Sequence, residues 1–87
     1  MRYEIRLSSR AQRELSRLDR PTQQRMKRRL NQLAEDPFDP RLSKELVNQG
    51  GLRSSRIGGW RIIFEILEKE IVLVLLIERR GQVYQRI

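Results

Sequence analysis

Seven consecutive apolar residues, Ile71 to Ile77, constrain the fold of this chain more than any other feature. The run is far too short to span a bilayer as a helix, which takes about 20 residues. It contains no alternating polar residues, so a strand formed here would be buried on both faces. The run therefore predicts the central strand of a small β-sheet.

The residues at the start of the chain indicate a strand followed by a helix. In residues 1–7, Tyr3, Ile5 and Leu7 alternate with charged residues, and this period of two is typical of a half-buried strand. Ser9 is expected to begin the helix, because Gln12 stands three residues later in a capping-box pattern.

A second helix is predicted from Pro21 to Asp36. Proline suits the first turn of a helix, and a residue that precedes proline, as Asp36 does, avoids the helical region. The apolar positions with helical spacing are Met26, Leu30 and Leu33, and the positions expected on the opposite, solvent side are Arg25, Lys27, Arg28 and Arg29. The short connection to the first helix favours an antiparallel helical hairpin.

The second half of the chain is predicted to be a loop followed by strands. Residues 36–51 have the composition of a loop, and residues 52–57 that of a strand. Gly58 and Gly59 would form a tight hairpin turn into a strand over residues 60–67. On that strand one face is expected to carry Ile62, Phe64 and Ile66.

These elements predict a single α+β domain over residues 1–87. Their order is β-α-α-β-β-β, with or without a final strand over residues 83–87, which gives three to four mostly antiparallel strands after the helical hairpin. Both helices would pack on one face of the sheet. An 87-residue chain has room for one small core.

The net charge and the missing residue types exclude several classes of function. The formal net charge is +8, and lysine occurs only at Lys27, Lys44 and Lys69, so arginine supplies most of the positive charge. Such a chain is expected to bind nucleic acid, an anionic membrane or an acidic protein. The chain has no cysteine and no histidine, which excludes thiolate chemistry, histidine catalysis and the usual zinc ligands. No metal or other cofactor is expected. The first seven residues do not have the pattern of a signal peptide, so a cytoplasmic protein is expected.

Two groups of arginines lie where strands are expected to end. The first group is Arg53, Arg56 and Arg61, on both sides of the two-glycine turn, and the second is Arg79 and Arg80, followed by Tyr84. If the apolar strand is central, the two groups should emerge side by side and could hold a phosphate. The alternative is a charged sheet edge that discourages pairing with another strand. The sequence leaves both explanations open.

Two further features have a structural explanation and a functional one. Trp60 could stack on an unpaired RNA base, but core packing beside the hairpin is the favoured interpretation. The arginine-rich helix faces are most simply generic surface that attracts polyanions through its electric field.

Four segments together resemble the RelE/ParE superfamily of toxins from type II toxin–antitoxin pairs. They are YEIRLSSRAQREL at the start, LAEDP at the end of the second helix, RIGGWRIIFEI at the hairpin and RRGQVY near the end. The resemblance covers essentially the whole chain. It implies a RelE-like fold, similar to that of microbial ribonucleases, and a toxin held in check by a cognate antitoxin.

The resemblance also implies roles for individual residues. In RelE-type members, a ribose 2′-hydroxyl attacks the adjacent phosphate of an mRNA in the ribosomal A site. By position, Arg61 would hold that phosphate, Arg56 would stabilise the developing charge, and Arg79 or Arg80 would protonate the leaving group. Tyr84 would orient the substrate or stack on it.

Further RNA contacts are expected from Arg53, Lys44 and Trp60. Well-studied RelE enzymes have lysines in the strand before the hairpin turn, whereas this chain has Arg53 and Arg56 there. Arginine is a poor general base, so the identity of the base is left open, with Lys44 as a remote candidate.

The function expected from these observations is a ribosome-dependent, metal-independent endoribonuclease. Its partners would be an antitoxin, mRNA and ribosomal RNA, and no membrane. The alternative is a ParE-like toxin that inhibits DNA gyrase by binding and needs no catalytic residues. A nucleic-acid-binding module without toxicity is a third, weaker interpretation.

Overall fold

A five-stranded mixed sheet forms the centre of the computed structural model, which describes residues 2–68 and 70–79. The elements in chain order are β1 (Glu4–Leu7), α1 (Ser9–Ser16), α2 (Arg20–Glu35), β2 (Lys44–Glu45), β3 (Arg53–Ile57), β4 (Trp60–Leu67) and β5 (Ile71–Arg79). The predicted α+β fold is confirmed. No helix in the described ranges is long and apolar enough to cross a membrane.

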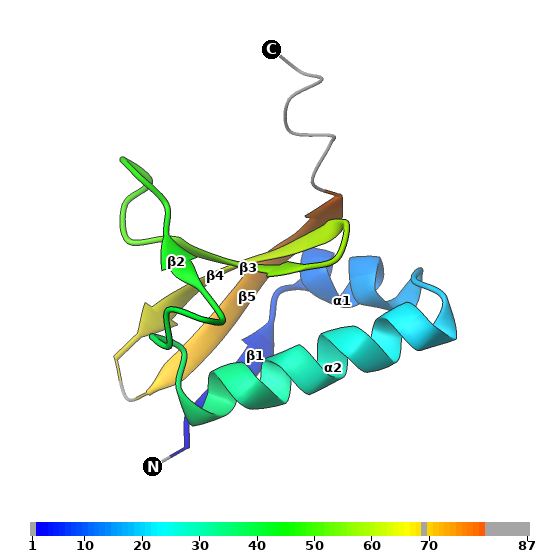
Figure 1. The fold of residues 1–87 in the computed structure, drawn as a ribbon, viewed down its shortest axis with the longest axis horizontal. Coiled ribbons are helices and arrows are strands. Elements are labelled where there is room, and N and C mark those ends of the chain that lie inside the picture. Colours follow the sequence, from blue (N-terminus) through cyan, green and yellow to red (C-terminus); the bar gives the residue numbers. More distant parts are fainter. Residues whose placement is uncertain (1, 69, 80–87) are drawn as a thin grey trace.

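The strand order is β1-β5-β4-β3-β2, so the apolar strand β5 lies inside the sheet as predicted. β1 pairs with β5 in parallel, and the other neighbouring strands pair antiparallel. Both helices lie on the same side of the sheet (Figure 1). We call this side the helix face and the opposite side the open face.

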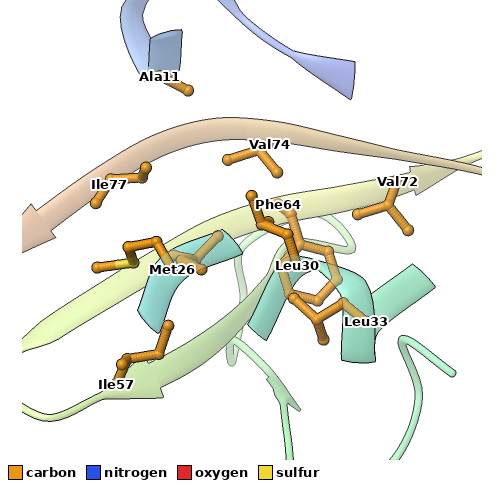
Figure 2. Close-up of a cluster of buried hydrophobic side chains, with 10 residues drawn as sticks. Ala11, Met26, Leu30, Leu33, Ile57, Phe64, Val72, Val74 and Ile77 are labelled. Atoms are coloured by element: carbon orange, nitrogen blue, oxygen red, sulfur yellow. The ribbon is translucent and has the colours of Figure 1, made fainter. Parts of the chain in front are cut away.

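The hydrophobic core fills the space between the helices and the helix face. Met26, Leu30 and Leu33 of α2 meet Phe64 of β4 there (Figure 2). Ile62 and Phe64 are fully buried and Ile66 packs against the same cluster, which confirms the predicted inward face of β4. Burying a side chain such as Phe64 contributes about 1.5–3 kcal/mol to folding.

The first helix begins at Ser9, as predicted, but its cap differs from the one that the capping-box pattern suggests. Its N-cap is Ser8 and not Ser9: the Ser8 hydroxyl oxygen accepts a hydrogen bond of 3.0 Å from the Ala11 amide. The same hydroxyl donates to the Leu75 carbonyl at 2.7 Å. Ser8 therefore satisfies a free amide of the helix and fixes α1 to β5, a tertiary role that the capping pattern alone does not reveal.

The segment predicted to be a loop contains the short edge strand β2. Lys44 pairs with Ser54, and Glu45 pairs with Arg53. A two-residue strand has no hydrophobic period of its own, so pairing with β3 creates it. The preceding turn is fixed by the Ser43 hydroxyl, which donates to the Pro37 carbonyl at 2.6 Å.

The hairpin between β3 and β4 has its turn at Gly58 and Gly59, as predicted. Gly58 has φ +56°, a left-handed conformation that glycine adopts at little cost. β5 continues to Arg79, two residues past the predicted apolar run. The strand considered for residues 83–87 lies outside the described residues.

Candidate functional site

Two arginines and one carboxylate face one another across three strands of the open face. Arg56 of β3 is directly opposite Arg61 of β4, and Arg61 is directly opposite Glu78 of β5. The residues next to them in the chain, Ile57, Ile62 and Ile77, are part of the core on the other side. Since neighbouring residues of a strand point to opposite faces, the three charged side chains belong to the open face. We call Arg56, Arg61 and Glu78 the open-face row.

The central member of this row is held in place by an ion pair. Nη2 of Arg61 donates to Oε1 of Glu78 at 2.7 Å, and the two side chains are only 20% and 23% exposed. Within the described residues, the buried Nε of Arg61 has no hydrogen-bond partner. A buried donor without a partner calls for an acceptor such as water or an anion oxygen. Arg61 is thus oriented by Glu78 and keeps donor capacity.

Arg56 has an exposed side chain on a fixed stretch of backbone. Its carbonyl oxygen accepts a 2.7 Å hydrogen bond from Nη1 of Arg29, which also donates to the Ser55 hydroxyl oxygen at 2.8 Å. Arg29 reaches β3 from α2 and is half-buried, and this burial lowers its pKa below the ordinary value. The two bonds fix the backbone from which Arg56 projects.

The expectation that Arg29 lies on the solvent side of the helix was therefore wrong. Arg29 stands three residues after Met26, so its side chain falls beside the apolar stripe and not opposite it. That spacing is the signal that could have placed it. Of the arginines assigned to the outer side of α2, Arg25 and Arg28 are exposed.

Lys44 lies closer to the row than its position in the sequence suggests. It pairs with Ser54, which is two residues before Arg56 on the same face of β3. Lys44, Ser54 and Arg56 line one hollow together with Arg41. The positive charge at this side of the open face therefore comes from β2, β3 and β4.

Three of the predicted site residues lie on the helix face and do not join the row. Trp60 is directly opposite Arg79, and the Arg79 guanidinium carbon lies 5.2 Å from the centre of the Trp60 ring. Arg53 donates from Nε to the Ser43 hydroxyl oxygen at 3.2 Å and lies 5.2 Å from the Phe38 ring centre. Arg79 is at the same end of the sheet as Arg61 but on the other face. Arg80 and Tyr84 are outside the described residues.

The outer surface of the helices carries a second group of positive charges. Its members are exposed, and in the described chain none of them forms an ion pair: Arg13, Arg17, Arg20, Arg25, Lys27 and Arg28. We call these six residues the basic helix surface. No group of three or more His, Cys, Asp or Glu residues within the described ranges could hold a metal ion.

Comparison with known proteins places these features in a family. Residues 5–84 match the family described as the ParE toxin of the type II toxin–antitoxin system, parDE. No curated protein sequence gives a significant match.

The fold is similar to that of solved toxin–antitoxin proteins. A chain of the RelBE2 complex from Mycobacterium tuberculosis is 24% identical, with a TM-score of 0.80 over 92% of this chain and 100% of that one. A chain of the archaeal RelE–RelB complex from Pyrococcus horikoshii OT3 is 20% identical, with a TM-score of 0.77 over 94% and 99%. The isolated E. coli RelE toxin is 19% identical, with a TM-score of 0.77 over 97% and 93%. The protein therefore belongs to the ParE toxin family, within the RelE/ParE superfamily of toxins from type II toxin–antitoxin systems.

Proposed function

We propose that this toxin cleaves mRNA on the ribosome and that the open-face row binds the scissile phosphate. The observation that carries the proposal is the direct opposition of Arg56 and Arg61 on adjacent strands of the open face. Arginine binds phosphate through paired N–H donors, and two neighbouring guanidinium groups can stabilise the charge that develops on a phosphorane.

In this proposal each basic residue has a distinct role. Arg61, held by Glu78 and partly buried, grips the scissile phosphate, whereas the exposed Arg56 neutralises charge as it builds up. Lys44 adds positive charge at the edge of the same face. The attacking group is the ribose 2′-hydroxyl, and the products are a 2′,3′-cyclic phosphate and a 5′-hydroxyl.

The basic helix surface favours a binding partner that is a polyanion. The large apolar side chains that are exposed in the described residues, Phe38, Val47 and Leu67, all lie outside α1 and α2. A protein interface normally has an apolar centre, whereas an array of arginines without one suits a phosphate backbone. Ribosomal RNA is the proposed partner of this surface.

A protein partner is also part of the proposal. Several of the similar structures are complexes of a toxin with its antitoxin, among them the RelBE2 complex from Mycobacterium tuberculosis and the RelE–RelB complex from Pyrococcus horikoshii OT3. A net charge of +8 favours an antitoxin segment that is acidic.

The second candidate function is inhibition of DNA gyrase without cleavage. The observation that favours it is the matching family itself, which is that of the ParE toxin. In this case the open-face row would act through charge alone. Loss of a single hydrogen-bonding group in the row would then weaken binding without abolishing a chemical step.

Primer extension on a reporter mRNA separates the two candidates. The purified toxin is incubated with the mRNA alone and with mRNA-programmed ribosomes, and a gyrase supercoiling assay is run in parallel. Cleavage within A-site codons that requires ribosomes supports the nuclease. Inhibition of supercoiling without any RNA cleavage contradicts it and supports the gyrase toxin.

A further inference from the structure

We propose that Glu78 is the general base of the cleavage reaction. This inference rests on the proposed nuclease function. The sequence left the base unidentified, since the strand before the hairpin turn has arginines where related enzymes have lysines. The strand that supplies the base is instead β5, on the other side of Arg61.

The location of Glu78 follows from the register of the sheet. Arg61 stands between Arg56 and Glu78, and its Nη2 lies 2.7 Å from Oε1 of Glu78. A phosphate held by Arg61 would therefore lie beside the Glu78 carboxylate. The 2′-hydroxyl that attacks this phosphate is on the adjacent ribose, so a phosphate bound by Arg61 would bring this hydroxyl towards Glu78, as a general base requires.

The chemical character of Glu78 also fits the role. A carboxylate accepts hydrogen bonds through both oxygens, and the bond to Arg61 uses Oε1, so Oε2 is the oxygen that would accept from the 2′-hydroxyl. Arginine and a charged lysine amine are donors only, so neither Arg56 nor Lys44 can accept the proton in that state. The half-buried position of Glu78 limits competition from water.

Other nearby carboxylates do not meet these conditions. Glu65 is on the same face of β4, but it lies four residues from Arg61, about 13 Å along the strand. Glu14 belongs to α1, where Oε1 accepts from the Ile77 amide at 2.8 Å and Oε2 from Nε of Arg10 at 3.1 Å. Glu14 is thus engaged on the helix side of the sheet.

The proposed step balances without a metal or a redox partner. The 2′-O–H bond breaks and its proton moves to Glu78, while the 2′-oxygen forms a bond to phosphorus. The bond from phosphorus to the 5′-oxygen breaks, and its electron pair stays on the 5′-oxygen. That oxygen takes a proton from solvent water, and Glu78 returns its proton to solvent.

A simpler explanation is that Glu78 only neutralises Arg61. Substitution by glutamine distinguishes the two, since the amide keeps the size and an oxygen acceptor for Arg61 but cannot take up a proton. The base role predicts that Glu78→Gln lowers the single-turnover rate of cleavage on programmed ribosomes by about 10²–10⁴-fold. Affinity for an mRNA with a 2′-deoxy residue at the cleavage position should stay within about threefold of the wild-type value or become tighter, because one negative charge is gone.

The matched control is Glu65→Gln, which removes a carboxylate from the same face at a distance from the row. It should cleave at the wild-type rate. Glu78→Asp keeps a carboxylate that is one methylene shorter, and it should retain part of the activity that Glu78→Gln loses. If Glu78→Gln fails to fold, Glu78→Asp still tests the assignment of the base.

Three results would overturn the assignment. The first is a folded Glu78→Gln variant that cleaves within about threefold of the wild-type rate, while Arg61→Ala is inactive. The second is an equal loss of activity in folded Glu78→Asp and Glu78→Gln, accompanied by lost affinity for the 2′-deoxy mRNA. Both would leave the nuclease function standing. The third is the absence of cleavage by the wild-type toxin, which would refute the proposed function and this inference together.

Discussion

The hydrogen bonds of Arg29 allow a quantitative prediction about stability. We consider Arg29→Met, which keeps most of the aliphatic stem and removes the guanidinium donors. Nη1 of Arg29 donates to the Ser55 hydroxyl oxygen at 2.8 Å and to the Arg56 carbonyl at 2.7 Å. Ser55 is 0% exposed, so water cannot readily replace the lost donor.

The expected loss can be worked out from these contacts. A hydrogen bond to a charged group contributes about 1.5–3 kcal/mol to stability. The two bonds share one nitrogen and the side chain is partly exposed, so we expect Arg29→Met to lower the free energy of unfolding by about 2 kcal/mol. A domain of this size is stable by only about 4–13 kcal/mol, and the midpoint temperature should fall by roughly 8–16 °C.

Urea unfolding followed by circular dichroism measures this change directly. The matched control is Arg28→Met, one residue earlier on α2, where the side chain is exposed. It should change the free energy of unfolding by less than about 0.5 kcal/mol. Equal stability of the two variants would refute the idea that Arg29 ties α2 to β3.

Two further predictions concern the hairpin turn and an acidic side chain. Gly58→Ala forces a Cβ onto a residue with φ +56°, and this left-handed backbone should cost about 1–2 kcal/mol of stability in urea unfolding. The new Cβ would lie 2.9 Å from Nη2 of Arg25, the end of a flexible side chain that can move aside. Gly59→Ala has open space at that point and should be nearly neutral, and a larger loss at Gly59 than at Gly58 would contradict this account. Arg41 donates to Asp39 at 2.9 Å and holds the pKa of that carboxyl below its usual range. The Asp39 carboxylate therefore contributes stability above the ordinary aspartate pKa, and this contribution is lost as the pH falls through the lowered pKa of Asp39. Carboxyl ¹³C NMR titration should show the lowered pKa of Asp39. Arg41→Gln should return this pKa toward the ordinary value.

Elements with a strong local period could be predicted from the sequence. The apolar run over residues 71–77 and the strand over residues 60–67 follow from their patterns, and Gly58 and Gly59 fix the hairpin that joins β3 to β4. The register of that hairpin places Arg56 opposite Arg61, as the turn implies. What depends on pairing between distant segments was missed. β2 is a strand only because β3 lies beside it. Ser8, whose hydroxyl also bonds β5, was missed as the N-cap because the capping-box pattern points to Ser9.

The candidate site likewise contains residues that local sequence spacing could place and residues that only strand pairing could place. Sequence spacing predicted that Arg56 and Arg61 lie together. It could not show on which face of the sheet Glu78 and Arg79 lie, because a bulge interrupts the pairing of β4 with β5. Arg79 was expected beside them and instead faces Trp60 on the helix side. Glu78, one residue earlier, takes the place beside Arg61, and only the register of the sheet reveals it.

The central claim is that the open face, and not the helix face, holds the scissile phosphate. Arg61 and Arg79 test it as a pair, because both are arginines at the same end of the sheet and they project from opposite faces. We would compare Arg61→Gln and Arg79→Gln by primer extension on programmed ribosomes, after confirming that both variants fold. The account predicts that Arg61→Gln abolishes A-site cleavage and that Arg79→Gln keeps most of it. Loss of cleavage in Arg79→Gln with activity retained in Arg61→Gln would contradict the account and move the site to the helix face.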